Sequence, residues 1–283
     1  MKRKMIHVLI LLLVLAGIVI LAYPYASFFI SGRNQSYVIQ QYDDSLASLT
    51  KEQLKEEWER AKAYNDALPP NALYDPFTHG RSDMSQEYLS LLNPEGNGVM
   101  GSIQIPKIRA ELPIFHGTAA ETLESGVGHM EGSALPVGSA GTHAVLTGHT
   151  GLNTAKLFTD LHELVAGDEF YIHVLDQVLA YRVDQTIVVE PTDVETLLPA
   201  AGKDYVTLVT CTPYGVNSHR LLVRGERTAY TPEEIKERMA DTKPVTSKET
   251  WLLYLSIALI LLLILAVPAI QWRKRMRNRS SHP

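Results

Sequence analysis

Residues 204–225, "DYVTLVTCTPYGVNSHRLLVRG", have the pattern of two β-strands joined by a turn. The run "DYVTLVTC" is rich in β-branched and aromatic residues, "TPYGVNS" contains turn-forming residues, and "HRLLVRG" begins a second strand. Cys211, the only cysteine among 283 residues, stands at the end of the first strand. A side chain in that position is rigidly aimed and partly exposed, which a nucleophilic thiol requires.

Similar short runs recur between residues 98 and 228, separated by Gly, Pro, Asn and Asp; they include "GSIQIPKI", "HAVLTGH", "EFYIHVL" and "LAYRVDQTIVV". So many short strands predict a mainly β fold for this region, a barrel or a sandwich. Residues 156–164 and 191–198 are expected to interrupt the strands as helical turns. Thr192 and Glu195 match a capping-box pattern at the start of the second interruption.

The region ahead of the strands, residues 24–97, is expected to be helical. A helix is predicted over residues 45–68, because Leu54, Trp58 and Ala61 follow the helical spacing of apolar residues. Thr50 and Gln53 match a capping box, and two prolines end the segment.

Two long apolar segments lie near the ends of the chain, at residues 5–23 and 251–272. Each is long enough to cross a bilayer as a helix, which makes the chain a membrane protein. Basic residues at both outer ends predict that both termini are cytoplasmic and that the region between the segments is extracellular. The first segment also resembles a signal peptide, but its apolar run is long and "AYPYA" at residues 22–26 is a poor cleavage site.

Charge and composition exclude several classes of function. The chain has a net charge of −5, and its two tails carry eight basic residues and no acidic ones, so the part between them carries −13. An extracellular part this acidic is not expected to bind nucleic acid. One cysteine excludes a disulfide within the chain, and the histidines lack close ligand partners, so we predict no metal and no cofactor.

The partners of a reactive Cys211 can be narrowed by position. Arg220 lies nine residues later, where the second strand returns beside the thiol. Among ten histidines, His149 follows the strand-like run "HAVLTG" and so holds the same strand-end position as the cysteine. From the residues alone the inert alternative stays open, since a lone cysteine is often buried and a strand arginine is often a surface residue.

The full string "TLVTCTPYGVNSHRLLVRG" resembles the signature of sortases, the membrane-tethered cysteine transpeptidases of Gram-positive bacteria. Its continuation is similar to class C, the branch that polymerises pilins. The resemblance extends over "LPIFHGTAAETLESGVGHMEGSALPVG" and "THAVLTGHTGLNTAKLFTDL", and so covers roughly residues 98–227. A second membrane segment and the tripeptide Asp75, Pro76 and Phe77 also match that class.

The resemblance implies a closed eight-stranded β-barrel with short helices, preceded by a helical region and flanked by two transmembrane helices. It makes Cys211 the nucleophile, His149 the family's histidine and Arg220 the active-site arginine. The family cleaves an LPXTG-like sorting signal between Thr and Gly through a thioester. In class C the acceptor is a lysine amine of another pilin, and the product is an isopeptide-linked pilus.

In class C sortases an acidic residue and an aromatic residue form a lid over the site. Here that implies that Asp75 pairs with Arg220 and that Phe77 covers Cys211. One departure concerns the loop after the histidine, where the class commonly has Gly-His-Arg-Gly-Leu-Pro and this chain has "GHTGLN" at residues 148–153. The difference puts any transfer of substrate preference in doubt.

The expected organisation is therefore as follows: residues 1–23 a membrane segment, 24–97 the helical region with the lid around 75–77, 98–228 the catalytic barrel, 229–250 a linker, 251–272 a transmembrane helix and 273–283 a basic cytoplasmic tail. Two rival functions stay open. One is a housekeeping sortase that attaches surface proteins to cell-wall peptide. The other is a membrane scaffold for pilus assembly without enzymatic activity.

Overall fold

The computed structural model of the chain describes residues 2–69, 73–77 and 84–231, together with residues 233, 254, 255 and 258. The chain divides into two compact units, residues 1–30 with 243–283 and residues 31–242. In the first unit the described part is mainly the apolar beginning of helix α1 (Lys2–Ala47). Most of the second expected membrane segment, residues 251–272, lies outside the described residues.

Helix α1 is long and apolar enough to cross a membrane, the only such helix among the residues that the structure describes. It continues through Pro24 to Ala47, so the expected end of the first segment at residue 23 is not a helix boundary. Helix α1 therefore begins in the first unit and ends in the second. It is compatible with membrane anchoring.

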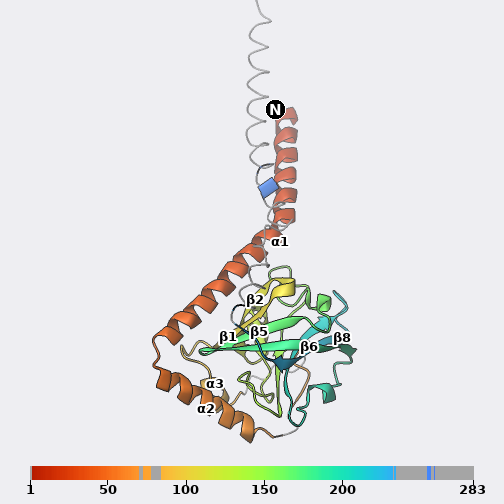
Figure 1. The fold of residues 1–283 in the computed structure, drawn as a ribbon. Helices are drawn as coiled ribbons and strands as arrows, with labels where there is room; N and C mark the ends of the chain where they lie inside the picture. Colours follow the sequence, from red (N-terminus) through yellow and green to blue (C-terminus); the bar gives the residue numbers. More distant parts are fainter. Residues whose placement is uncertain are drawn as a thin grey trace, which may run out of the picture. The chain divides into compact units, whose positions relative to one another are not determined.

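The second unit contains a closed eight-stranded barrel, which confirms the barrel expected for this region (Figure 1). Around the barrel the strand order is β1-β2-β3-β4-β7-β8-β6-β5. The strands are β1 (Val99–Ile105), β2 (Ala110–His116), β3 (Val127–His129), β4 (Thr142–Thr147), β5 (Glu169–Val174), β6 (Gln177–Val189), β7 (Asp204–Thr212) and β8 (His219–Thr228). Six of these correspond to runs that the composition predicts, whereas β2 and β3 were expected only through the family resemblance.

Alternation of side chains along each strand builds the barrel core. On β7, Val206 and Leu208 belong to the main apolar core, whereas Val209 belongs to a separate apolar cluster on the other face. Strands β4 and β7 run parallel, and Thr142 pairs with Asp204 at one end while Thr147 pairs with Val209 at the other. The ends of these two strands therefore meet at the same rim of the barrel.

The helices match the predictions in part. Helix α2 (Lys51–Ala67) has the expected capping box at Thr50 and Gln53, but it begins six residues later than predicted because residues 45–47 belong to α1. The predicted interruptions are single 3-10 turns, η2 (Leu161–Glu163) and η3 (Glu195–Leu197). The capping box predicted at Thr192 is wrong, because η3 begins after Val194 without a side-chain cap. The remaining short helices are α3 (Gln86–Ser90), η1 (Pro106–Ile108) and α4 (Ala120–Ser125).

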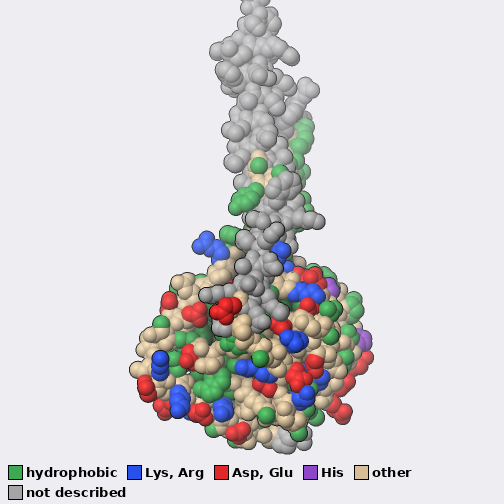
Figure 2. Space-filling view, viewed as in Figure 1, with side chains coloured by type: hydrophobic (Ala, Val, Ile, Leu, Met, Phe, Trp, Pro, Cys, Tyr) green, Lys and Arg blue, Asp and Glu red, His purple; other side chains and the backbone are tan. Residues whose placement is uncertain are grey.

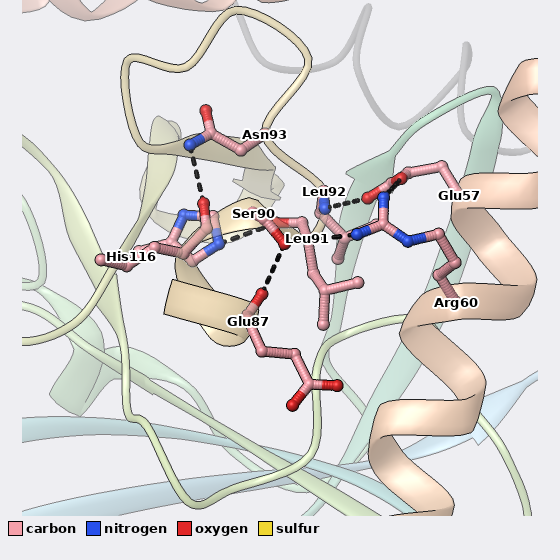
Figure 3. Close-up of polar contacts among 9 residues, drawn as sticks. Glu57, Arg60, Glu87, Ser90, Leu91, Leu92, Asn93 and His116 are labelled. Atoms are coloured by element: carbon pink, nitrogen blue, oxygen red, sulfur yellow. Dashed lines mark hydrogen bonds and ion pairs between the residues drawn. The ribbon is translucent and has the colours of Figure 1, made fainter. Parts of the chain in front are cut away.

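The loop after α3 is held between α2 and the barrel, as Figure 3 shows. From α2, the Glu57 carboxylate accepts a hydrogen bond from the Leu92 amide at 2.6 Å. From β2, the two ring nitrogens of His116 lie 2.8 Å from the Leu91 carbonyl oxygen and 3.0 Å from that of Gly98. These bonds attach the helical region to the barrel ahead of its first strand.

Candidate active site

Two of the predicted catalytic residues lie on adjacent strands, Cys211 on β7 and Arg220 on β8, and His149 lies two residues after the end of the neighbouring strand β4. Continuing the parallel register of β4 and β7 beyond Thr147 and Val209 places His149 beside Cys211. Two hydrogen bonds hold this part of the register: the Gly148 amide donates to the Val209 carbonyl at 3.1 Å, and the Thr210 hydroxyl donates to the Gly148 carbonyl at 2.7 Å. The strand end that leads to His149 therefore lies alongside the strand end that carries Cys211, although the two residues are 62 positions apart in the sequence.

On its other side Cys211 is paired directly with Arg220 of β8 in antiparallel register. Directly opposed residues of neighbouring strands point to the same face, so the thiol and the guanidinium share one face. Alternation along β8 places the neighbouring His219 on the opposite face, and its ring lies 3.1 Å from the Glu190 carboxylate. Strand β8 therefore runs back beside β7, as the composition of residues 219–225 predicts.

Asp75, from the segment at residues 73–77, forms a two-point ion pair with Arg220. Its carboxylate oxygens accept from Nε at 2.8 Å and from Nη2 at 2.7 Å, and both side chains are buried. Nη1 donates to the carbonyls of Asn217 and His219 at 3.2 and 3.1 Å. Since a guanidinium has five N–H donors, four of the five are occupied in this arrangement.

Phe77 lies between two of the predicted catalytic side chains. Its ring centroid is 5.6 Å from that of His149, and the Arg220 guanidinium carbon lies 5.0 Å from the Phe77 centroid. We name the described residues 73–77 the lid, after the lid that the family resemblance implies. Three of its side chains, those of Leu73, Tyr74 and Phe77, pack against an apolar patch of five buried residues: Met130, Val145, Leu197, Val209 and Leu222.

A cavity of about 150 Å³ adjoins one end of the lid. Its lining includes Leu73 of the lid, His143 of β4 and Leu197 of η3. The cavity lies beside the Thr142 end of β4, opposite the end that leads to His149.

Burial shifts the pKa values of Cys211 and His149. It raises the pKa of the Cys211 thiol; the Arg220 charge lowers that pKa and the Asp75 charge raises it, both by smaller amounts. Burial also lowers the pKa of His149, and the Glu124 carboxylate raises it by less. Both shifts favour a neutral thiol beside a neutral imidazole at neutral pH.

The loop after His149 is packed closely in spite of its departure from the class pattern. A side chain on Gly148 would come within 2.7 Å of the Phe158 ring. Gly151 has a φ of +73°, which favours glycine, and a Cβ there would meet the exposed Tyr214 ring at 3.0 Å. Since both glycines are retained, the departures at Thr150 and Asn153 leave these two contacts in place.

Several contributors to the site were not predicted. Asn217 holds Arg220 through its carbonyl and has a left-handed backbone with φ of 59°, and its place in the turn "GVNS" was the available signal. Nothing in the sequence pattern pointed to Glu124, whose carboxylate raises the pKa of His149. Among the residues that the structure describes, no group of three or more His, Cys, Asp or Glu side chains could hold a metal ion.

Figure 2 shows acidic and basic side chains interspersed over the visible face of the second unit. Some charged side chains pair directly, as Arg224 of β8 does with Asp184 of β6 at 2.7 Å. On the visible face the acidic side chains are spread among basic ones rather than gathered in one patch.

Comparisons with known proteins agree with this architecture. The family model described as the Sortase domain matches residues 103–228. The chain is 31% identical to sortase D of Bacillus subtilis (strain 168) over 153 residues, which cover 53% of this chain and 74% of that protein.

Two crystal structures resemble this chain at higher sequence identity. Sortase C of Streptococcus pneumoniae, whose structure was described in connection with pilin substrate specificity, is 46% identical with a TM-score of 0.65 and covers 69% of this chain and 98% of its own. Sortase C-1 of Actinomyces oris is 47% identical with a TM-score of 0.60 and covers 62% of this chain and 99% of its own. The barrel, its single cysteine and these similarities show that the chain belongs to the sortase family of cysteine transpeptidases.

Proposed function

We propose that this chain is a membrane-anchored sortase that cleaves an LPXTG-like sorting signal between Thr and Gly and joins the pilin to a lysine of another pilin. The observation that carries the proposal is the convergence of three strands. The thiol of Cys211 lies directly opposite Arg220 and at the strand end next to His149. The similarity to a sortase C described with pilin specificity supports the choice of substrate.

The first half-reaction forms an acyl-enzyme. The Cys211 sulfur attacks the Thr carbonyl carbon after its proton passes to His149, and Arg220 stabilises the oxyanion that develops on the carbonyl oxygen. The bond between the Thr carbonyl carbon and the Gly nitrogen breaks, and His149 gives its proton to the leaving amine. The product is a thioester between the pilin and Cys211.

The second half-reaction transfers the pilin. A neutral lysine amine attacks the thioester carbon, its excess proton passes to His149, and the Cys211 sulfur leaves and recovers that proton. The new bond is an isopeptide bond between the two pilins. The acidic extracellular part is compatible with an approaching lysine, and shared anchoring raises the local concentration of substrates in the membrane.

The lid would hold the enzyme in a closed state. With Asp75 on Arg220, four of the five guanidinium donors are occupied, and Phe77 packs against the His149 ring. A substrate that needs Arg220 must therefore displace Asp75. This arrangement favours a pilus-assembly sortase over a housekeeping sortase.

The test is a transfer reaction with the full chain in detergent micelles. Candidate pilins with an LPXTG-like motif are incubated with the wild-type chain, and the new bond is mapped by mass spectrometry. A pilin–lysine isopeptide is expected, and Cys211→Ala should form none while keeping the wild-type Tm. Transfer to a cell-wall peptide alone would indicate the housekeeping function, and polymer formation by Cys211→Ala would indicate a scaffold.

A further inference from the structure

The short helix α4 packs against strand β3 on the outer face of the barrel. A Cβ on Gly128 of β3 would meet the buried Leu123 side chain of α4 at 2.9 Å, so the helix lies directly over this glycine. Gly128 is paired with Thr147 of β4, and directly opposed residues of neighbouring strands share a face. Helix α4 therefore lies on the face to which Thr147 belongs.

His149 lies on the same face. The residue between Thr147 and His149 points inwards, because a Cβ on Gly148 would meet Phe158 of the barrel core at 2.7 Å. Since side chains alternate along an extended chain, His149 returns to the face of Thr147. The catalytic histidine and helix α4 are thus on one side of the barrel wall.

The strand register brings the last turn of α4 to His149. Strand β3 runs antiparallel to β4, and continuing the pairing of Gly128 with Thr147 by two residues places Gly126 opposite His149. Gly126 is the C-cap of α4, and Glu124 lies two residues before it. The end of α4 that carries Glu124 therefore borders the histidine.

The carboxylate of Glu124 is available to interact with the His149 ring. The residue is exposed, and no hydrogen bond or ion pair within the described part of the chain takes up its carboxylate. Burial lowers the pKa of His149, and the Glu124 carboxylate raises it by less. This electrostatic effect agrees with the position that the register gives to Glu124.

The other charges around His149 are already balanced. The titratable and charged groups of the surrounding elements are the Asp75–Arg220 ion pair, the Cys211 thiol, the Tyr214 ring that packs against Gly151, and the Lys156–Asp160 ion pair. Each ion pair joins one acid to one base, and burial raises the pKa of the thiol. Among these described groups, the Glu124 carboxylate is the negative charge that no neighbouring cation offsets.

We propose that Glu124 is a positioning residue of the active site, whose carboxylate stabilises the protonated ring of His149 during the two proton transfers. This inference rests on the proposed function, in which His149 first accepts the Cys211 proton and then gives it to the leaving amine. When the proton arrives on the ring, the imidazolium and the carboxylate attract each other, and no proton moves to Glu124. The carboxylate therefore favours the charged state that forms during the reaction over the neutral resting state.

The experiment compares Glu124→Gln, which removes the charge, with Glu124→Lys, which reverses it. Cleavage of an LPXTG peptide is measured against pH with the full chain in detergent. At neutral pH we expect kcat/KM to be about threefold lower in the glutamine variant, the size of one exposed charge interaction, and lower still in the lysine variant. Because His149 is then protonated less readily, the acid limb of the profile should move to lower pH in the same order.

Two controls separate this charge effect from damage to the helix. Glu121→Gln removes the same charge one turn earlier on α4 and should keep the wild-type profile. In 1 M salt, where exposed charges are screened within about 3 Å, the difference between wild type and Glu124→Gln should shrink. A fall in kcat/KM without movement of the acid limb, or an equal effect of Glu121→Gln, would overturn the inference.

NMR of the chain labelled at histidine gives a reading that does not need cleavage. The His149 signal is identified by its absence from His149→Gln, and its titration midpoint should be lower in Glu124→Gln than in wild type. An unchanged midpoint, with a wild-type chain that cleaves the peptide, overturns this inference alone. Absence of cleavage by the wild-type chain would overturn the proposed function and the role of Glu124 with it.

Discussion

The thiol and the imidazole of the proposed catalytic pair are both biased towards their neutral forms. Burial disfavours charge on either group, so it raises the pKa of Cys211 and lowers that of His149. Arg220 opposes the first shift, but Asp75 lies on Arg220 and offsets its charge. In the proposed closed state the thiol of Cys211 is therefore held in its less reactive protonation state.

Removing the Phe77 ring should make the thiol more acidic. The proposed lid puts the Phe77 ring over Cys211, so Phe77→Ala should let water reach the thiol and relieve the desolvation that raises its pKa. The pH midpoint of iodoacetamide alkylation, measured on the one thiol of the chain, is expected to move below that of wild type. Tyr37→Ala, which truncates an exposed aromatic residue of α1, serves as the control and should not move it. An unchanged midpoint in Phe77→Ala would contradict the covering role.

Breaking the pair between Asp75 and Arg220 should activate the enzyme. Asp75→Asn removes the charge that holds the lid, so a larger fraction of molecules is open and the apparent peptide affinity rises with that fraction. We expect kcat/KM for LPXTG peptides to increase severalfold. The matched control is Asp184→Asn, which breaks a two-point pair with Arg224 of the same strand and should leave cleavage unchanged. Slower cleavage in Asp75→Asn would show that the carboxylate assists the reaction.

At the scale of the elements, the parallel pairing of β4 with β7 determines the site. It brings two strand ends to one rim, and His143 ties this pair to the segment after η3 through the Leu198 carbonyl. Burial lowers the pKa of His143 to about 4, so the ring is neutral in the folded protein at neutral pH. The unfolded chain binds a proton at this residue at a higher pH than the folded chain does.

This difference predicts acid sensitivity. Above about pH 6.5 the His143 ring is neutral in both the folded and the unfolded chain, so the free energy of unfolding does not depend on its titration. As the pH falls from 6.5 towards 4, the unfolded chain gains a proton at this ring that the folded chain does not, and the free energy of unfolding decreases by about 3 kcal/mol in total. Denaturant unfolding of His143→Asn should depend less on pH in this window than unfolding of wild type. It should not become independent of pH, because burial also lowers the pKa of His129 to about 4. The control is His162→Asn, which replaces an exposed histidine and should keep the pH dependence of wild type. If wild type and His143→Asn have identical pH profiles, His143 does not contribute to the acid sensitivity.

The strands that carry the site were the most predictable elements. β7 and β8 have an unbroken β-rich composition, and turn residues between them place Arg220 beside Cys211 without further information. β3 has three residues and is held by its neighbours, and β2 contains Pro113, so neither has a local signal of its own. The bond between Asp75 and Arg220 joins residues 145 positions apart, and only the family resemblance pointed to it.

At the scale of the whole molecule, the proposed function depends on the catalytic unit lying outside the membrane. Helix α1 is compatible with an anchor at one end, and the proposed topology places both termini in the cytoplasm. Membrane-bound pilins would then meet the enzyme at a high local concentration. The position of Cys211 in the barrel offers a direct probe of this topology.

A membrane-impermeant maleimide should label Cys211 in intact cells. Because the chain has one thiol, all labelling reports this position, and the Phe77→Ala variant makes it more accessible. We expect equal labelling before and after permeabilisation of the cells. Cys211→Ala is the control for background, and labelling that appears only after permeabilisation would place the barrel on the cytoplasmic side.

The central claim is that Cys211 carries the acyl group during transfer, and the intact mass of the protein tests it most directly. The full chain with Asp75→Asn is mixed with an LPXTG peptide in the absence of a lysine acceptor, quenched in acid and analysed by mass spectrometry. The account predicts that the mass of the chain increases by that of the acyl group of the peptide up to its Thr, which is the free fragment less one water. This adduct should lie on Cys211, be removed by hydroxylamine and be absent from Cys211→Ala. Release of the glycine fragment without an adduct on Cys211, or an adduct on any other residue, would contradict it.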